Sequence, residues 1–364
     1  MKNQIAYLSI LAFLWLFASA CSTVEENDEP GGGIGPTDPN SSDWLIPSNQ
    51  VFDGGPGKDG IPSIDDPQFS NVDEIDFLLQ NDLVIGVKVG STIRAYPHPI
   101  LDWHEIVNDE VSGMGLAITY CPLTGTAIGW KRDHIDGTRT TFGVAGLLYN
   151  TNLIPYDRAT DSNWSQMLLK SVNGELIGEE IETYPLVEMP WSTWKTLFPD
   201  SEVLNLNTGF NRAYGNYPYG DYRTNNNLFI SPVNPRDDRL PSKERGLGVI
   251  VDGAAKFYRF EHFGGGTVKV ITDSFKGQEL VVVGSQELNF MVAYQRRLND
   301  GTMLEFTAVD GEGDVVMEDQ EGNRWNIWGE AVSGNRQFER LQPTESYIGM
   351  WFAWGAFYPR PEIF

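Results

Sequence analysis

The sequence predicts a mainly β protein, a β-rich α+β chain built from two tandem, divergent repeats of a barrel- or sandwich-like unit with short helices. Most apolar stretches alternate at a period of two, which is typical of β-strands. Similar segments also recur in the same order about 160 residues apart. They pair residues 83–96 with 245–258, 130–138 with 294–302, and 194–203 with 354–363. Several matches in one order indicate an internal duplication.

The first 21 residues have the pattern of a lipoprotein signal peptide. Lys2 gives a positive start, an apolar run follows at residues 5–18, and small residues precede Cys21. We therefore expect Cys21 to be lipidated and to anchor the chain to a membrane, with cleavage as an ordinary secretory signal as the alternative. Residues 22–42 are rich in Gly, Pro and acid, and predict a flexible tether. The expected location is the bacterial cell envelope, at the outer membrane. The sequence does not decide between the periplasmic face and the outer surface.

The body of the chain is predicted to have three parts. Residues 43–204 form the first repeat and carry the candidate site, and residues 245–364 form a second, degenerate repeat. Residues 205–244 are full of Asn, Tyr, Pro, Arg and Gly, and read as a long connector between them. Short helices are expected at residues 102–109 and 190–198, the second opened by a proline.

The chain is strongly acidic, with 26 basic against 50 acidic residues and a formal net charge of −24 at pH 7. This charge excludes nucleic acid and anionic lipid headgroups as partners, because polyanion binding needs the opposite sign. Small molecules, metal cations and neutral glycans remain open as ligands. With Cys21 lipidated, Cys121 has no disulfide partner, so the hydrophobic core must hold the body together.

Residues 95–132 contain two of the four histidines and the only cysteine outside the leader. Cys121 ends an apolar stretch and enters a Pro-Leu-Thr-Gly turn, and strand ends are where reactive groups are usually displayed. A thiol becomes nucleophilic when a neighbouring group lowers its pKa. We expect His104 to act as the base, Glu105 to orient it, and Thr124 to donate a hydrogen bond to the thiolate.

Two other interpretations of these residues stay open. Cys121 can be an inert core residue, and His104 can belong to a structural hydrogen-bond network. Alternatively, His98, His104 and Cys121 are chemically suited to bind zinc or copper, although their spacing matches no known metal motif. The second repeat places Ser285 opposite Cys121, as expected if only the first repeat kept the reactive residues.

Two further features that could suggest ligand binding have simpler structural explanations. Residues 310–321 have acids at several calcium-loop positions, but Val315 replaces the required glycine, so we expect a solvated acidic turn. Eleven tryptophans would suit a glycan-binding surface, but several recur at matching positions of the two repeats, which favours packing. No Ser-His-Asp signature, phosphate loop or dinucleotide fingerprint is present in the sequence.

Several motifs resemble a family of exported bacterial and archaeal proteins, domain of unknown function family 3179. They are residues 60–69, 95–109, 119–127, 142–164, 237–249 and 352–359. The resemblance runs from about Asp59 to the C-terminus and implies no established activity. Many members carry a second cysteine where Thr124 stands here. This difference argues against a dithiol mechanism in this chain, while single-thiol and metal roles survive.

These observations leave two functional hypotheses. The first is a lipid-anchored envelope protein of unestablished activity, with a thiol or metal site built from His104, Glu105 and Cys121 and tuned by Thr124. The second is a non-catalytic surface protein that binds a glycan or a protein partner. The sequence leaves open whether the protein is an enzyme.

Overall fold

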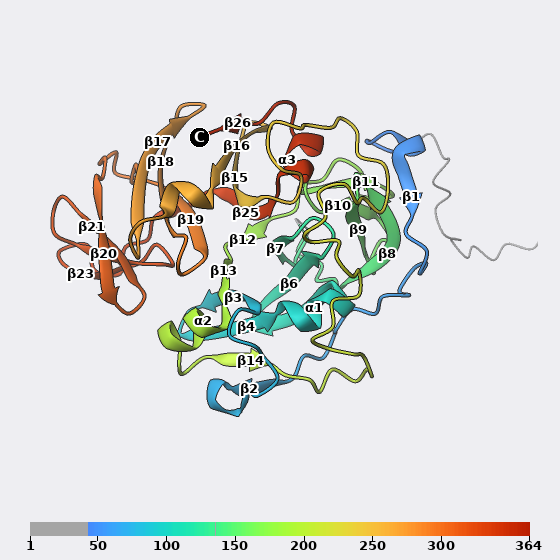
Figure 1. The fold of residues 1–364 in the computed structure, drawn as a ribbon, viewed down its shortest axis with the longest axis horizontal. Helices are drawn as coiled ribbons and strands as arrows, with labels where there is room; N and C mark the ends of the chain where they lie inside the picture. The colour runs from blue at the N-terminus through green and yellow to red at the C-terminus, as the bar shows by residue number, and fades with distance from the viewer. Residues whose placement is uncertain (1–42, 135) are drawn as a thin grey trace, which may run out of the picture. The chain divides into compact units, whose positions relative to one another are not determined.

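The period-two stretches of the sequence form the strands of six sheets in a computed structural model that describes residues 43–134 and 136–364 (Figure 1). Only three α-helices occur in these described residues, each seven residues long, so the mainly β prediction is confirmed. None of these helices is long and apolar enough to cross a membrane. The predicted signal peptide, the lipidated Cys21 and the tether lie outside the described residues.

The first half of the chain contains three sheets, with strand orders β1-β8-β9-β10-β11, β12-β7-β6-β5 and β13-β3-β4-β14-β2. The strands are β1 (Val51–Asp53), β2 (Phe69–Asn71), β3 (Leu83–Val89), β4 (Thr92–Pro97), β5 (Ile106–Val111), β6 (Met114–Cys121), β7 (Thr126–Lys131), β8 (Phe142–Tyr149), β9 (Asn152–Asp157), β10 (Asn163–Ser165), β11 (Lys170–Asn173), β12 (Thr183–Tyr184), β13 (Val187–Pro190) and β14 (Glu202–Leu204). Helices α1 (His98–His104) and α2 (Trp191–Leu197) lie in this half.

The second half also contains three sheets, with strand orders β25-β15-β16-β26, β17-β18-β19-β24 and β20-β21-β22-β23. The strands are β15 (Arg245–Val251), β16 (Ala254–Arg259), β17 (Lys269–Phe275), β18 (Gln278–Ser285), β19 (Phe290–Gln295), β20 (Phe306–Glu312), β21 (Val315–Asp319), β22 (Arg324–Asn326), β23 (Ala331–Ser333), β24 (Gln342–Pro343), β25 (Glu345–Met350) and β26 (Glu362–Ile363). Helix α3 (Trp351–Phe357) follows β25, as α2 follows β13.

One sheet of each half has the same order of four strands. The pair β3-β4 lies between β13 and β14, and the pair β15-β16 lies between β25 and β26, with β4-β14 and β16-β26 parallel. In each of the two strand pairs a glycine lies against a helix tryptophan, from α2 in the first half and from α3 in the second. A Cβ added to Gly86 would lie 2.0 Å from the Trp194 ring, and one added to Gly248 would lie 2.2 Å from the Trp354 ring. The origin of this correspondence by duplication stays a prediction, as do the boundaries at residues 204 and 245.

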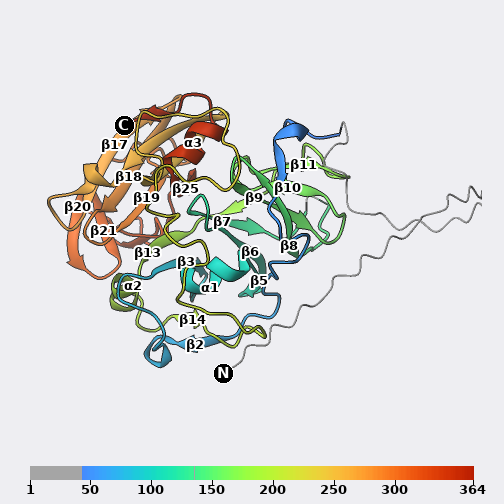
Figure 2. The ribbon, with the colours of Figure 1, turned by 45° about the vertical axis from the view of Figure 1, so that its right-hand side comes forward.

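Helix α1 lies four residues earlier than the sequence pattern suggested. It begins at His98, with Pro99 in its first turn, and ends at His104, where Glu105 adopts a positive φ of 58°. The alternating stretch that follows pairs with β6 as strand β5, because its apolar residues are buried between neighbours. The other expected helix is confirmed as α2, which follows Pro190. Helix α1 packs against β3, β4, β5 and β6, and this arrangement is visible in Figure 2.

Residues 205–244 contain no helix or strand and run across both halves. Figure 1 shows this yellow segment passing near α1 and α3. It is tied to α1 by a hydrogen bond from Trp103 to Asn216 and to α3 by one from Trp351 to Asp237. The halves also touch directly, through β7 with β25 and β13 with β19. The connector is therefore packed against the end of β6, where Cys121 lies.

Candidate functional site

The end of strand β6 holds Cys121 in the interior of the protein. The Cys121 side chain is fully buried, and its S–H group donates to the Thr151 carbonyl oxygen at 3.9 Å. Burial raises the pKa of the Cys121 thiol to about 11, and the nearby Glu105 carboxylate raises it further. A thiol with such a pKa is protonated at neutral pH. Cys121 is therefore an unreactive, protonated thiol in this structure, and it needs a proton acceptor before it can react.

Glu105 is placed beside this thiol by the end of α1. Its backbone N–H donates to Leu101 and its carbonyl accepts from Tyr120, which fixes it next to the last residues of β6. The side chain is only 4% exposed, and no group among residues 43–134 and 136–364 donates a hydrogen bond to its carboxylate. Burial, with a smaller contribution from Asp102, raises the pKa of Glu105 to about 8. A buried, unpaired carboxyl on a backbone with positive φ is typical of a functional residue.

His104 faces away from the thiol into a hydrogen-bond network. Its Nδ1 lies 2.7 Å from the Pro62 carbonyl oxygen and its Nε2 lies 2.6 Å from the Tyr214 hydroxyl. The carbonyl can only accept, so Nδ1 donates to it, and Nε2 accepts from Tyr214. Burial lowers the pKa of His104, in keeping with a neutral ring. Both nitrogens are thus occupied, and the expected proton transfer from Cys121 to His104 finds no free nitrogen.

Thr124 lies in the turn after Cys121, inside a fully buried polar network. Thr126 donates to Gln166, so the 2.8 Å contact between the two threonine hydroxyls has Thr124 as donor. Asn152 donates to Thr124 at 2.9 Å. A hydrogen bond from the Thr124 hydroxyl acts to lower the pKa of Cys121, against the larger effect of burial. The hydroxyl of Thr124 donates to Thr126 in this structure, and its predicted role toward a thiolate stays a prediction.

The connector brings a lysine to this site that sequence reasoning missed. Lys243 is 8% exposed, and its Nζ atom is buried without a hydrogen-bond partner among the described residues. It lies 3.3 Å from the ring centre of Tyr222, whose hydroxyl is also buried and unpartnered. Ring faces favour the ammonium form, but burial is the larger effect and lowers the pKa of Lys243 to about 7. The charge of a Cys121 thiolate would raise the pKa of Lys243. The rings of Tyr222 and Phe352, which Lys243 contacts, belong to the same core cluster as Cys121.

A cavity of about 220 Å³ borders the same turn. Tyr120 and Gly125, on either side of the turn that contains Cys121, form part of its wall. The charged lining residues include Asp102, Arg223 and Arg245. Arg223 pairs with Asp102 and donates to the Tyr120 hydroxyl at 3.1 Å. The cavity is therefore a polar space beside the turn that follows Cys121, and Cys121, Glu105 and Lys243 are not part of its wall.

The predicted metal ligands do not form one group. The Nε2 of His98 lies 3.1 Å from Glu188, which also pairs with Arg245, while His104 and Cys121 have the separate surroundings described above. No cluster of three or more His, Cys, Asp or Glu side chains suited to a metal occurs in the described part of the chain. That result also covers the acidic residues 310–321, which lie in the β20-β21 hairpin. The residues present do not fit zinc or copper.

The tryptophans pack inside the protein and do not line an outer face. Seven of the ten described tryptophans are buried, and Trp44, Trp103 and Trp328 are partly buried. Trp164 and Trp325 each donate an indole N–H to an aspartate of their own half, at 3.1 and 2.9 Å. The observation that suggested a glycan-binding face therefore has a packing explanation.

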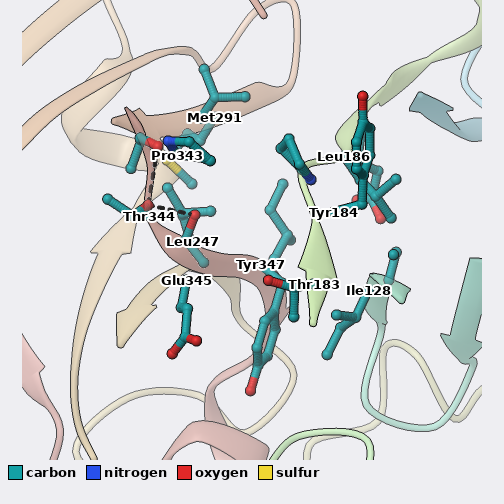
Figure 3. Close-up of a pocket in the computed structure, with 18 of the residues that line it drawn as sticks. Ile128, Thr183, Tyr184, Leu186, Leu247, Met291, Pro343, Thr344, Glu345 and Tyr347 are labelled. Carbon is teal, nitrogen blue, oxygen red and sulfur yellow. Dashed lines mark hydrogen bonds between the residues drawn. The ribbon is translucent and has the colours of Figure 1, made fainter. Parts of the chain in front are cut away.

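A second cavity, of about 110 Å³, lies where the two halves meet (Figure 3). Ile128, Tyr184 and Leu186 lie on one side, and Met291 and Pro343 on the other. Its lining contains carboxylates but no cysteine, histidine, lysine or arginine. This cavity is a packing gap between sheets, whereas a histidine and two arginines line the cavity of about 220 Å³ at the Cys121 turn.

Sequence reasoning missed Lys243, Tyr222 and Arg223 because they lie in the segment interpreted as a connector. Their only signal was their position within or near the family motif at residues 237–249 and within an aromatic stretch of the connector. Catalytic and binding residues are found disproportionately on loops held by a rigid scaffold. Applied to residues 205–244, that rule would have pointed to them.

A comparison with protein families matches residues 58–361 to the family described as "Protein of unknown function (DUF3179)". Because the match covers most of the chain, the protein belongs to this family, and the resemblance in its motifs is confirmed. No curated protein and no solved structure matches the chain.

Proposed function

We propose that this DUF3179 protein is an exported, lipid-anchored envelope protein whose buried thiol centre performs nucleophilic chemistry on a small acyl compound. Cys121 is the nucleophile, and Lys243 and Glu105 transfer protons. One observation carries the proposal: the ammonium group of Lys243 is buried without a hydrogen-bond partner among the described residues, against rings of the core cluster that contains Cys121. Buried polar groups are nearly always hydrogen-bonded, so an unpaired one of this kind marks a functional site.

The shifted pKa values support a division of roles. Near neutral pH the Cys121 thiol and the Glu105 carboxyl are protonated, while Lys243, with a pKa of about 7, is partly an amine. Lys243 can therefore take the thiol proton and hold the thiolate as an ion pair. Glu105 is left as the proton donor, since a buried acid with a raised pKa suits that task.

The reaction class that uses these groups is acyl transfer to the thiol. The Cys121 thiolate adds to the carbonyl carbon, the bond to the leaving group breaks, and the leaving group takes the proton of Glu105. A water molecule then attacks the thioester and gives a proton to the Glu105 carboxylate. The released thiolate recovers its proton from Lys243, so every group returns to its starting state. Thr124 stabilises the thiolate whenever it is present.

The correspondence between the halves supports a single working site per chain. Ser285, which the sequence alignment sets opposite Cys121, is buried and accepts a hydrogen bond from Leu288 at 3.0 Å. We infer that residues 43–204 carry the reactive set, that residues 205–244 complete it, and that residues 245–364 are a degenerate copy. The matching sheet orders support this reading.

The proposed thiol chemistry is tested by labelling Cys121 in the full-length chain. We expect slow alkylation that rises with pH through about 7 as Lys243 loses its proton, and a thioester adduct on Cys121 after exposure to p-nitrophenyl acetate. Lys243→Met should reduce both by at least about tenfold while leaving the fold intact, because methionine suits the aromatic surroundings. Lys170→Met, at a partly exposed lysine that pairs with Glu180, is the matched control.

A Cys121 that labels only after unfolding would refute the thiol proposal. It would favour the second hypothesis, a non-catalytic protein that binds a partner. The location is tested separately: replacing Cys21 with serine should release the protein from the membrane fraction if Cys21 is lipidated. Unchanged membrane association of the serine variant would contradict the anchor.

A further inference from the structure

The cavity beside Cys121 has an excess of hydrogen-bond donors. Arg223 and Arg245 both line it, and each guanidinium carries five N–H groups. Arg245 donates to Glu188 through one nitrogen, Nη2, and Arg223 uses Nη2 for Asp102 and Tyr120. Most of their N–H groups therefore have no acceptor among the described residues and remain available to a ligand.

The acidic partners of these arginines are already occupied. Glu188 accepts from both His98 and Arg245, and Asp102 accepts from Arg223. His98 is 5% exposed and lines the cavity, and it uses Nε2 for Glu188. Two cations in one small space, held at fixed positions by buried partners, form a preorganised receptor for acceptor oxygens.

The size and place of the cavity restrict its ligand. Its volume of about 220 Å³ corresponds to roughly seven water molecules at ~30 Å³ each. The part of a ligand that enters it is therefore smaller than a drug-sized molecule. Tyr217 stacks under Arg223 at 3.8 Å and donates to the Pro122 carbonyl at 3.0 Å, so it connects the arginine to the thiol turn.

We propose that Arg223 and Arg245 form a subsite for the carboxylate of a small anionic substrate, which the subsite holds against Tyr120 and Gly125, the residues on either side of the Cys121 turn. This inference rests on the proposed function and deepens it by naming the substrate class. A carboxylate matches the planar fork of a guanidinium, and neighbouring Nη and Nε groups can bind both of its oxygens. A neutral amide of the same shape lacks the charge and one acceptor.

The test measures the binding of small carboxylates and their matched amides to the full-length chain by calorimetry, at constant ionic strength. The panel is glutarate, succinate and acetate against glutaramide, succinamide and acetamide. We expect at least one carboxylate to bind at least about tenfold more tightly than its amide. Arg223→Gln should remove that preference, whereas Arg236→Gln, which alters an exposed arginine outside the cavity, should keep it.

A second variant tests the subsite even if Arg223→Gln does not fold. Asp102→Asn frees Arg223 from its competing carboxylate without changing the shape of the side chain, so carboxylate affinity should rise by severalfold. Equal binding of carboxylates and amides, no binding by the panel, or no rise in Asp102→Asn would each overturn the subsite. All binding is repeated with Cys121→Ser: retained binding with an unreactive wild-type thiol would keep the subsite and refute the thiol chemistry. A reactive thiol in a protein that shows no preference for carboxylates would support the thiol chemistry and refute the subsite.

Discussion

Replacing Glu105 with glutamine should make the protein more stable at alkaline pH. The pKa of this carboxyl is raised from 4.5 to about 8, so the folded protein binds a proton that the unfolded chain releases between these pH values. Stability is therefore complete below pH 4.5 and falls as the pH rises toward 8. At about 1.4 kcal/mol per unit, the total loss is at most about 5 kcal/mol. The side chain is 4% exposed, so solvent screening reduces this figure little.

Glutamine keeps the shape of the side chain and carries no charge to bury. The free energy of unfolding of Glu105→Gln, minus that of the wild type, should thus increase steadily between pH 5 and 8. Urea titrations at each pH provide this difference, and Glu287→Gln, at an exposed position, controls for the loss of one surface charge. Lys243 and Asp102 titrate in the same range, but they are present in both proteins and cancel to first order. Parallel pH profiles for Glu105→Gln and the wild type would refute the claim that this carboxyl is buried and unpaired.

Three further predictions address packing and the site. Gly86→Ala should cost at least about 2 kcal/mol of stability, because its methyl group would overlap the Trp194 ring, whereas Gly266→Ala, in open space, should be neutral by thermal unfolding. His104→Ala should cost about 2–4 kcal/mol in urea titrations and leave the pH profile of Cys121 alkylation unchanged, since its nitrogens bond elsewhere; a shifted profile would restore it as the base. Cys121→Ser should abolish labelling and cost about 1–3 kcal/mol, as a hydroxyl is buried in place of the thiol; a fully stable variant would mean that the site is wetter than the structure indicates.

Much of the fold followed from the sequence because its physical signals are local. Alternating apolar residues marked most of the strands, and the glycines that recur 162 residues apart at Gly86 and Gly248 corresponded to the same contact with a helix tryptophan. The predicted helix near residue 102 was misplaced because the stretch from Asp102 to Asp109 fits both the helical and the strand spacing of apolar residues. Its true start depends on Pro99 and its end on the positive φ of Glu105, which only the packed sheet imposes.

The site was predictable in part for a different reason. Cys121, Glu105 and Thr124 are close in sequence, so one turn and one strand pair bring them together. Lys243 is 122 residues away from Cys121, and no local pattern records that the connector folds back over β6. His104 looked like the natural base because it precedes Glu105, but the turn at the end of α1 sends the two side chains to different partners.

Because residues 205–244 pack near Cys121, the labelling rate of this thiol measures how often the segment opens. Every reagent that reaches Cys121 must wait for this segment, or the turn beneath it, to open locally. When closing is fast, the ratio of the observed labelling rate to that of an exposed thiol equals the opening equilibrium constant. A thousandfold protection would correspond to an opening free energy of about 4 kcal/mol. If substrate entry uses the same opening, the rate constant of opening sets a ceiling on turnover, and labelling measures that constant only when closing is slow.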